Sequence, residues 1–230
     1  DIRNVLGSER IVVASNMVGI ASASAANISV PALEGPIRVV FLSRITSKKN
    51  LIGAIDILAR VSCPVEFDIH GIIEDTAYWA ECQQHIAALP GHVTARYVGE
   101  VKPNRVEEVL APYDLFLFPT LGENYGHVIR EALSAGLPVL VSDQTPWRGL
   151  VERGAGADLS LENSAAFVRW IEDFHRSSPA QRLIMRAAAQ RLGNDPAKAE
   201  SDLTANRIML HAAITSGACD RLVHRKTYRA

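Results

Sequence analysis

Cysteine is scarce in this chain, and the residues that are present do not form a recognisable pattern. Three cysteines occur in 230 residues, at positions 63, 82 and 219, and none belongs to a C-x-x-C motif. An odd count without that spacing argues against a disulfide framework and against a zinc site. The seven histidines are scattered and form no H-x-x-x-H pair. We therefore expect reduced thiols, a cytoplasmic location and no bound metal.

The sequence also lacks an excess of one charge and a long hydrophobic run. The formal net charge is -1, from 24 basic and 25 acidic residues. Without a strong field, no bulk attraction to nucleic acid is indicated, and a small ligand is the better expectation. The apolar stretch from Ile11 to Ile28 is interrupted by serine and asparagine and follows no basic segment. It predicts neither a membrane-spanning helix nor a signal peptide.

Several motifs that carry common chemistries are absent as well. There is no G-x-x-x-x-G-K-[ST] loop for a nucleoside triphosphate and no G-x-S-x-G nucleophile elbow. No Asp-x-Asp pair occurs, so the divalent-metal clamp of many nucleotide-sugar enzymes has no ligands here.

The middle of the chain alternates short β-branched or aromatic runs with longer amphipathic ones. This alternation is typical of βαβ units and predicts an α/β fold with a doubly wound parallel sheet, Rossmann-like, whose ligand binds at the carboxyl ends of the strands. The predicted strands are Ile37–Leu42, Val65–His70, Val93–Val98, Leu115–Phe118 and Pro138–Val141, with a weaker one near Asp158. The predicted helices are Asn50–Val61, Asp75–Leu89, Asn104–Leu110 and Gly126–Ala135.

The two ends of the chain have a different composition from its middle. Residues 1–35 hold one short apolar run and a Ser/Ala-rich stretch, which indicates either the remnant of a preceding domain with a linker or a loosely packed arm. Residues 36–178 form the predicted Rossmann-like domain. Residues 179–230 have a helical pattern, with Pro179 and Pro196 as helix starts and Gly193 and Gly217 as stops.

The most informative segment runs from Pro119 to Val141. It begins where the predicted strand Leu115–Phe118 ends, passes two glycines and enters the predicted helix Gly126–Ala135. A glycine-bearing strand-to-helix loop at the carboxyl edge of a sheet offers backbone N–H groups and a helix dipole to a phosphate.

Glu123 lies in this loop and Glu131 follows eight residues later. On a continuous helix, that spacing would separate them by about 12 Å along the axis at 1.5 Å per residue. Such a separation suits the two ends of an extended ligand, for example a sugar and a ribose, better than a carboxylate dyad across one bond. The alternatives are a solvated helix residue for Glu131 and a helix cap or dipole partner for Glu123.

The same segment carries a family resemblance. The run G-E-N-Y-G-H-V-I-R-E-A-L-S-A-G-L-P-V-L resembles the E-x7-E signature of retaining glycosyltransferase family 4, the glycosyl transferases group 1. The run S-R-I-T-S-K-K-N, after the first predicted strand, is similar to the family's G-R-L-x-x-x-K-G. The loop Ser142–Gly149 departs from the family's S-D-x-G-G-x-P-E, because both glycines and the acid are missing.

The resemblance implies the donor-binding C-terminal half of a GT-B enzyme. It places Arg44 and Lys49 on the donor diphosphate and Glu123 near the transferred sugar, and these three are the predicted catalytic residues. It places Glu131 on the ribose. The remaining predicted donor-binding residues are Asn124, Tyr125, Gly126, His127, Gly71, Val98 and Gly99.

The implied reaction is transfer of a hexosyl group from a UDP- or GDP-sugar to an acceptor hydroxyl, with retention and without a metal. The resemblance suggests bacterial surface polysaccharide or glycolipid synthesis, an acceptor-binding N-terminal domain absent from this chain, and no activity of the isolated half. The alternatives are a GT-B nucleotide-sugar epimerase and a non-catalytic nucleotide-sugar-binding module. The basic residues within positions 221–229 could contact an anionic membrane surface, or could belong to a solvated terminus.

Overall fold

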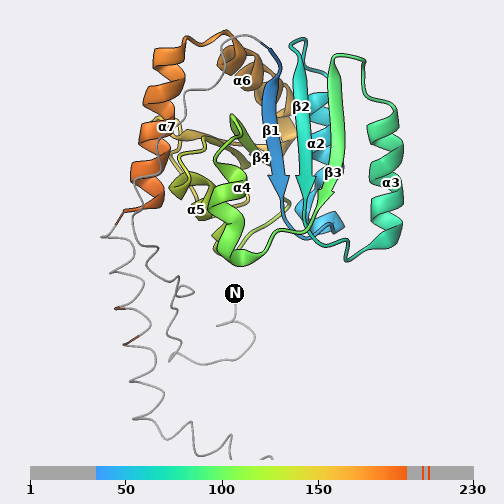
Figure 1. Cartoon of the computed structure of the whole chain (residues 1–230), viewed down its shortest axis with the longest axis horizontal. Coiled ribbons are helices and arrows are strands. Elements are labelled where there is room, and N and C mark those ends of the chain that lie inside the picture. Colours follow the sequence, from blue (N-terminus) through green and yellow to red (C-terminus); the bar gives the residue numbers. More distant parts are fainter. Residues whose placement is uncertain (1–34, 196–203, 205–206, 208–230) are drawn as a thin grey trace, which may run out of the picture. The chain divides into compact units, whose positions relative to one another are not determined.

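A computed structural model describes residues 35–195, together with Thr204 and Arg207. Its compact unit contains one parallel sheet of six strands in the order β3-β2-β1-β4-β5-β6 (Figure 1). The strands are β1 (Ile37–Leu42), β2 (Val65–His70), β3 (Val93–Gly99), β4 (Leu115–Phe118), β5 (Val139–Ser142) and β6 (Gly156–Leu159). The order confirms the predicted doubly wound Rossmann-like sheet.

The direction of winding reverses between β1 and β4. The chain first moves outward from β1 to β2 and β3, and it then returns to the other side of β1 to add β4, β5 and β6. The register of the sheet pairs Val39 of β1 with Phe67 of β2 and with Leu115 of β4. In open parallel sheets, ligands bind beyond the carboxyl ends of the strands at such a reversal. The loops after β1 and β4 therefore meet at the expected binding edge.

Two layers of helices cover the sheet (Figure 1). One contains α2 (Leu51–Leu58), α3 (Thr76–Ala87) and α6 (Ser164–Arg176), and the other contains α4 (Val106–Leu110), α5 (His127–Ser134) and α7 (Pro179–Gly193). Short 3-10 helices precede α2, α4 and α6, at Ser47–Lys49, Pro103–Arg105 and Leu161–Asn163. Helix α7 packs on α5 and belongs to the same compact unit as the sheet.

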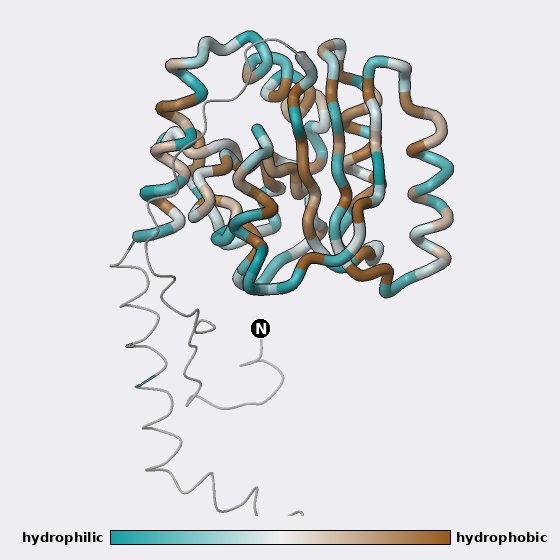
Figure 2. The backbone as a smooth tube through the Cα atoms, viewed as in Figure 1, coloured by the Kyte–Doolittle hydropathy of each residue, from teal (hydrophilic) through white to brown (hydrophobic). Residues whose placement is uncertain are grey.

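The core follows the central strands, which are the most apolar part of the chain (Figure 2). All four residues of β4 are buried, as are the last four residues of β1. Strand β3 is different because it lies at the edge of the sheet, and most of its residues are partly or fully exposed. Burial on both faces explains why β4 is an unbroken apolar run and why β1 is apolar except at Arg38.

Local signals account for where the helices begin and end. Asp75 caps α3 by accepting a hydrogen bond from the Tyr78 amide at 3.0 Å. Ser178 and Gln181 form a reciprocal capping box at the start of α7, with Pro179 in its first turn. The predicted start at Pro179 and stop at Gly193 are confirmed. The predicted helix start at Pro196 and the predicted stop at Gly217 lie outside the described residues, as do residues 1–34 and the basic tail.

The predicted bounds of β1, β2 and β4 match the structure, and those of the other strands and of the helices differ from it by one to a few residues. Strand β3 extends to Gly99, and β5 begins at Val139 because Pro138 has no N–H to donate to the ladder. Asn50 and Gly126, expected as first helical residues, instead precede α2 and α5 as left-handed caps, with φ of 56° and 77°.

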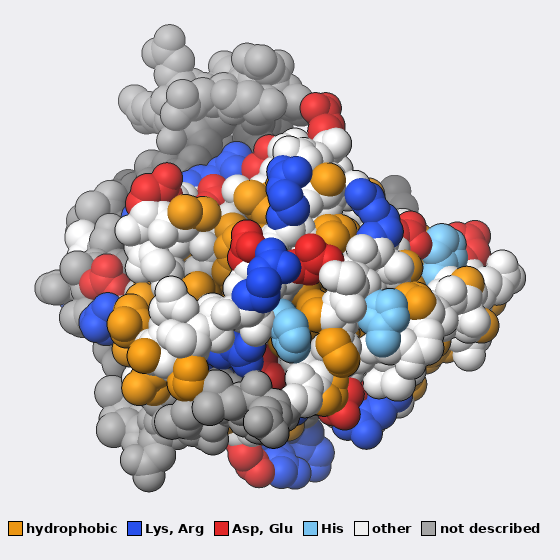
Figure 3. Space-filling model, turned by 90° about the horizontal axis from the view of Figure 1, so that it is seen from above, with side chains coloured by type: hydrophobic (Ala, Val, Ile, Leu, Met, Phe, Trp, Pro, Cys, Tyr) orange, Lys and Arg blue, Asp and Glu red, His pale blue; other side chains and the backbone are white. Residues whose placement is uncertain are grey.

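The amino edge of the sheet carries side chains of both signs, with basic and acidic groups interspersed (Figure 3). Among them is the ion pair between Arg38 and Asp114, whose nitrogen and oxygen atoms are 3.3 Å apart. Within the described part of the chain, no helix is both long enough and apolar enough to cross a bilayer.

Candidate functional site

A half-buried ion pair joins the loop after β1 to the loop after β4. We call residues 43–50 the β1 loop and residues 119–126 the β4 loop. The Lys49 ammonium lies 2.6 Å from a carboxylate oxygen of Glu123, and the two side chains are 10% and 19% exposed. The same ammonium lies 5.7 Å from the centre of the Phe118 ring. The structure thus brings together two of the three predicted catalytic residues at the reversal of the sheet.

Backbone and side-chain hydrogen bonds hold the two loops in this arrangement. The Asn50 side-chain amide donates to the Pro119 carbonyl at 2.8 Å. The Lys48 carbonyl accepts from the Thr120 hydroxyl at 3.1 Å and from the Leu121 amide at 3.0 Å. Because these bonds use groups from both loops, the position of Lys49 depends on the fold of the β4 loop.

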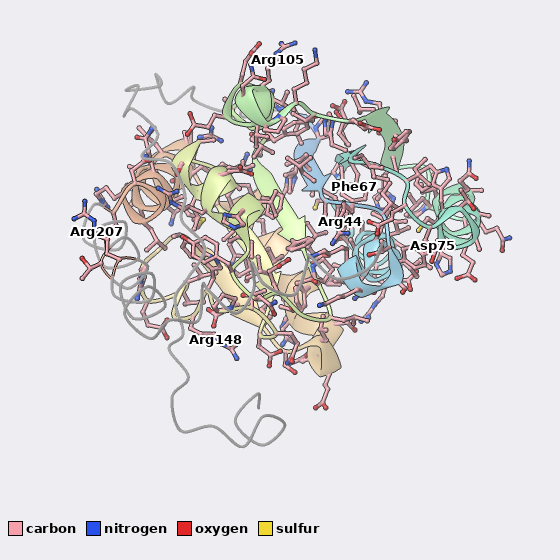
Figure 4. All side chains as sticks on the ribbon, turned by 90° about the horizontal axis from the view of Figure 1, so that it is seen from below. Arg44, Phe67, Asp75, Arg105, Arg148 and Arg207 are labelled. Carbon is pink, nitrogen blue, oxygen red and sulfur yellow. The ribbon has the colours of Figure 1, made fainter. Side chains whose placement is uncertain are left out.

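Arg44 lies on the same edge but has a different partner. Its guanidinium donates to the Glu74 carboxylate at 2.7 Å, and both side chains are largely exposed, at 61% and 48%. Figure 4 views the molecule from the carboxyl edge and labels Arg44 near the middle of it. The two predicted diphosphate-binding cations are therefore on one loop, but each is paired with its own carboxylate in the free protein.

The β4 loop ends in a left-handed turn at Gly126, directly before α5. Its φ of 77° disfavours any residue with a side chain, and a Cβ at this position would also lie 2.8 Å from the Cδ1 atom of Ile129, which would have to shift. The rings of Tyr125 and His127 lie against each other, with centroids 4.5 Å apart. The Asn124 amide donates to the Glu123 carboxylate at 3.3 Å. The predicted donor-binding residues 124–127 thus form one continuous turn beside the ion pair.

Glu131 lies on α5, four residues after its start at His127. The predicted separation from Glu123 assumed a continuous helix, and it does not apply because α5 begins only at His127. Burial raises the pKa of Glu131, and the nearby carboxylate of Glu107 adds to this effect, while Arg130 opposes it. A half-buried carboxylate of this kind gains free energy when a ligand offers it hydroxyl donors.

The other predicted donor-binding residues lie at the ends of β2 and β3. The Gly71 amide donates to the Gly99 carbonyl at 3.0 Å, so these two loops are directly connected. Gly71 has a φ of 135°, and a Cβ there would overlap the Ser43 carbonyl oxygen of the β1 loop. Val98 is half exposed at the same edge. Gly71 is therefore needed for the close approach of two backbones.

None of the predicted site residues comes from the loop after β5, residues 143–149, which we call the β5 loop. The buried Trp147 donates its indole N–H to the Tyr125 carbonyl at 2.8 Å. The Gln144 carbonyl accepts from the Glu123 amide at 3.0 Å. A signal was present, since the tryptophan stands in the segment that departs from the family pattern.

Two further features of the described residues lie outside this group. A small hollow lies away from the carboxyl edge, and two of its charged residues, Arg96 and Asp68, form an ion pair with each other. Its lining is Arg38, Glu66, Asp68, Arg96, Pro112 and Tyr113. Within the residues that the structure describes, no cluster of histidine, cysteine or carboxylate groups could hold a metal ion.

Comparison with known proteins identifies related sequences and structures. The family model described as "Glycosyl transferases group 1" matches residues 25–191. The putative glycosyltransferase EpsF of Bacillus subtilis is 30% identical over 94 residues, which is 40% of this chain and 24% of EpsF.

Solved glycosyltransferase structures have the same fold. S. aureus TarM, in a complex that contains UDP, has a TM-score of 0.68 at 18% identity, over 89% of this chain and 40% of TarM. Anabaena HepE, in complex with UDP and glucose, has a TM-score of 0.62 at 22% identity, over 80% of this chain and 49% of HepE. The chain thus spans less than half the length of EpsF, TarM and HepE.

Proposed function

Because the chain belongs to the glycosyl transferases group 1, we propose that it is the donor-binding half of a retaining glycosyltransferase. The donor is a UDP- or GDP-sugar, the acceptor group is a hydroxyl, and the product belongs to a bacterial surface polysaccharide or glycolipid. An acceptor-binding N-terminal domain completes the site, so this half alone binds the donor without transferring the sugar. The binding of UDP by TarM and HepE supports the choice of ligand.

The observation that carries this proposal is the contact between Lys49 and Glu123 beside the start of α5. It combines a cation, a carboxylate and the positive end of a helix dipole at the reversal of the sheet. A diphosphate needs the cation and the dipole, and a sugar hydroxyl needs the carboxylate. An extended ligand that carries both a diphosphate and a sugar would interact with the cation, the carboxylate and the helix dipole.

In the proposed reaction, the bond between the anomeric carbon and the diphosphate breaks while the acceptor oxygen bonds to that carbon, and the proton of the acceptor hydroxyl passes to the leaving diphosphate. Negative charge develops on the leaving diphosphate. Lys49 and Arg44 stabilise it electrostatically together with the start of α5, so no metal is required. Glu123 binds the sugar and Glu131 binds the ribose, and residues 124–127 line the phosphate and the sugar. Residues Gly71, Val98 and Gly99 border the nucleotide base.

Ligand-dependent stabilisation tests the proposal. Melting of the chain is followed with UDP, GDP and their hexose conjugates, in the presence of EDTA or of manganese. A ligand at one hundred times its Kd stabilises a protein by about 2.7 kcal/mol. We expect stabilisation by one of the two nucleotides in EDTA. Absence of any effect would contradict donor binding, and an effect seen only with manganese would contradict the metal-free site.

Charge removal locates the diphosphate. Lys49→Ala and Arg44→Ala each remove a charged contact, worth roughly 1.5–3 kcal/mol when well aligned. We expect the smaller loss for Arg44, because its exposed side chain is screened by solvent. Arg176→Ala, at the end of α6, is the matched control and should leave calorimetric affinity unchanged. Unchanged affinity in the double variant of Arg44 and Lys49 would mean that the phosphates bind elsewhere.

A further inference from the structure

The β5 loop holds the β4 loop along its length. Trp147 binds the Tyr125 carbonyl at 2.8 Å, and the Gln144 carbonyl binds the Glu123 amide at 3.0 Å. Immediately before the β5 loop, the Ser142 hydroxyl donates to a further carbonyl of the β4 loop, that of Thr120, at 2.5 Å. The β4 loop is therefore bound at three positions, by the last residue of β5 and by two residues of the β5 loop.

The indole of Trp147 is well suited to hold one backbone group in a fixed direction. Its side chain is a rigid ring with a single N–H donor, and it is only 3% exposed. The Trp147 backbone amide donates to the hydroxyl of Thr145, which is also buried, at 3.3 Å. The Trp147 indole is thus held by its own loop as well as by its burial.

The bond from Trp147 fixes the orientation of the peptide that precedes Gly126. In a trans peptide the C=O and the N–H point in opposite directions, and the described chain contains no cis peptide. The Tyr125 carbonyl is directed at the buried indole, so the Gly126 N–H of the same peptide points away from it. If this peptide turned over, a carbonyl oxygen would take the place of the N–H and would repel an anion.

Gly126 makes this orientation decisive for α5. It has a φ of 77° and a ψ of 57°, and no side chain caps the helix that follows. Its carbonyl accepts from the amides of Ile129 and Arg130, so the turn at Gly126 sets the direction of the first helical turn. A Cβ at this glycine would lie 3.2 Å from the Trp147 nitrogen, which shows how closely the indole approaches the turn.

We propose that Trp147 is a positioning residue that holds the β4 loop in its phosphate-binding conformation before the donor arrives. Its N–H retains the Tyr125 carbonyl, and this directs the Gly126 amide and the start of α5 toward the diphosphate. This inference rests on the proposed function, since it assumes that a diphosphate binds there. It assigns a role to the segment in which the sequence departs from its family.

Trp147→Phe removes the N–H and keeps an aromatic ring. One neutral hydrogen bond contributes about 1 kcal/mol, so we expect UDP to bind five- to tenfold more weakly. The melting temperature of the ligand-free variant should fall as well, because part of a buried ring and its hydrogen bond are lost, and affinity is therefore measured well below that temperature. Uridine, which has no phosphate, should bind the variant and the unaltered chain equally well. GDP and guanosine replace this pair if the unaltered chain prefers guanine. Trp170→Phe, on α6 where Trp170 stacks on Phe174, is the matched control.

The outcomes separate this inference from the proposed function. Failure of UDP and GDP to bind the unaltered chain contradicts the proposed function. Equal UDP affinity in Trp147→Phe, or an equal loss for UDP and uridine, overturns the positioning role alone. The ligand-free chain supplies a second readout, because the amide resonances of residues 123–128 should shift in Trp147→Phe but not in Trp170→Phe. Unshifted resonances would also overturn the role.

Discussion

The ion pair between Lys49 and Glu123 connects the stability of the site to its proposed chemistry. Lys49→Met removes the charge and keeps most of the apolar stem, whereas Glu123→Gln keeps the shape and one acceptor oxygen. In the free protein each group neutralises the other at 2.6 Å. If the donor uses Lys49 for its phosphates and Glu123 for its sugar, the two substitutions should affect different parts of the donor.

The expected loss of stability follows from the burial of the pair. Exposed ion pairs contribute about 0–1 kcal/mol, while removal of one partner from a fully buried pair costs about 3–5 kcal/mol. With side chains 10% and 19% exposed, this pair lies between these limits. We expect Lys49→Met to cost about 2 kcal/mol, because it leaves the carboxylate unpaired. We expect Glu123→Gln to cost about 1 kcal/mol, because the amide oxygen can still accept from Lys49.

Affinity should respond differently from stability. Lys49→Met should weaken UDP by at least about tenfold through loss of a charged contact. Glu123→Gln should not weaken UDP, since it removes a carboxylate that competes with the phosphates for Lys49. It should weaken the full UDP-hexose, because the charged acceptor for a sugar hydroxyl is lost. If the unaltered chain prefers guanine, GDP and its hexose conjugate replace these ligands.

Urea unfolding gives the stabilities, and calorimetry gives the affinities for the bare diphosphate and the full donor. Asp173→Asn is a matched control, because the ion pair of Asp173 with Arg176 is exposed and distant on α6. It should change neither quantity by an amount that the assays resolve. If Glu123→Gln weakened UDP as strongly as Lys49→Met, the two residues would not divide phosphate from sugar, and the proposed placement of the donor would be wrong.

Three further predictions concern single positions. Burial raises the pKa of Glu131 above its ordinary value of 4.5, so the stability of the folded chain falls as the pH rises from 4.5 through the raised pKa. Glu131→Gln should therefore stabilise the chain at neutral pH but not below pH 4.5, as measured by urea unfolding. Asn50→Ala should cost about 2–3 kcal/mol in the same assay, through a strained left-handed residue, a lost cap and a lost bond to Pro119, while Asn50→Gly should cost less. Gly71→Ala should prevent folding, seen as lost circular dichroism, because its Cβ would overlap the Ser43 carbonyl. If any of these variants unfolded like the unaltered chain in its assay, the structural reason given for that position would be contradicted.

Much of the fold could be predicted because the strands carry strong local signals. The buried runs Ile37–Leu42, Val65–His70 and Leu115–Phe118 match β1, β2 and β4 at both ends. Burial on both faces of a parallel strand favours apolar residues, which the sequence displays directly: they are continuous in β4, interrupted by Arg38 in β1, and alternate with polar residues in β2. The helix ends were less accurate, because Asn50 and Gly126 adopt left-handed conformations that single residue types do not specify.

The sequence alone determined the α/β class, the alternation of strands and helices, and the carboxyl-edge location of Arg44, Lys49 and Glu123. These properties follow from periodicity and from the rule that parallel strands end at a common edge. Only the tertiary structure decided the partner of each group. It paired Lys49 with Glu123 across 74 positions and placed the Trp147 indole on the Tyr125 carbonyl. Such contacts depend on how loops from separate strands approach one another in the folded chain, and the residues within either loop do not encode that approach locally.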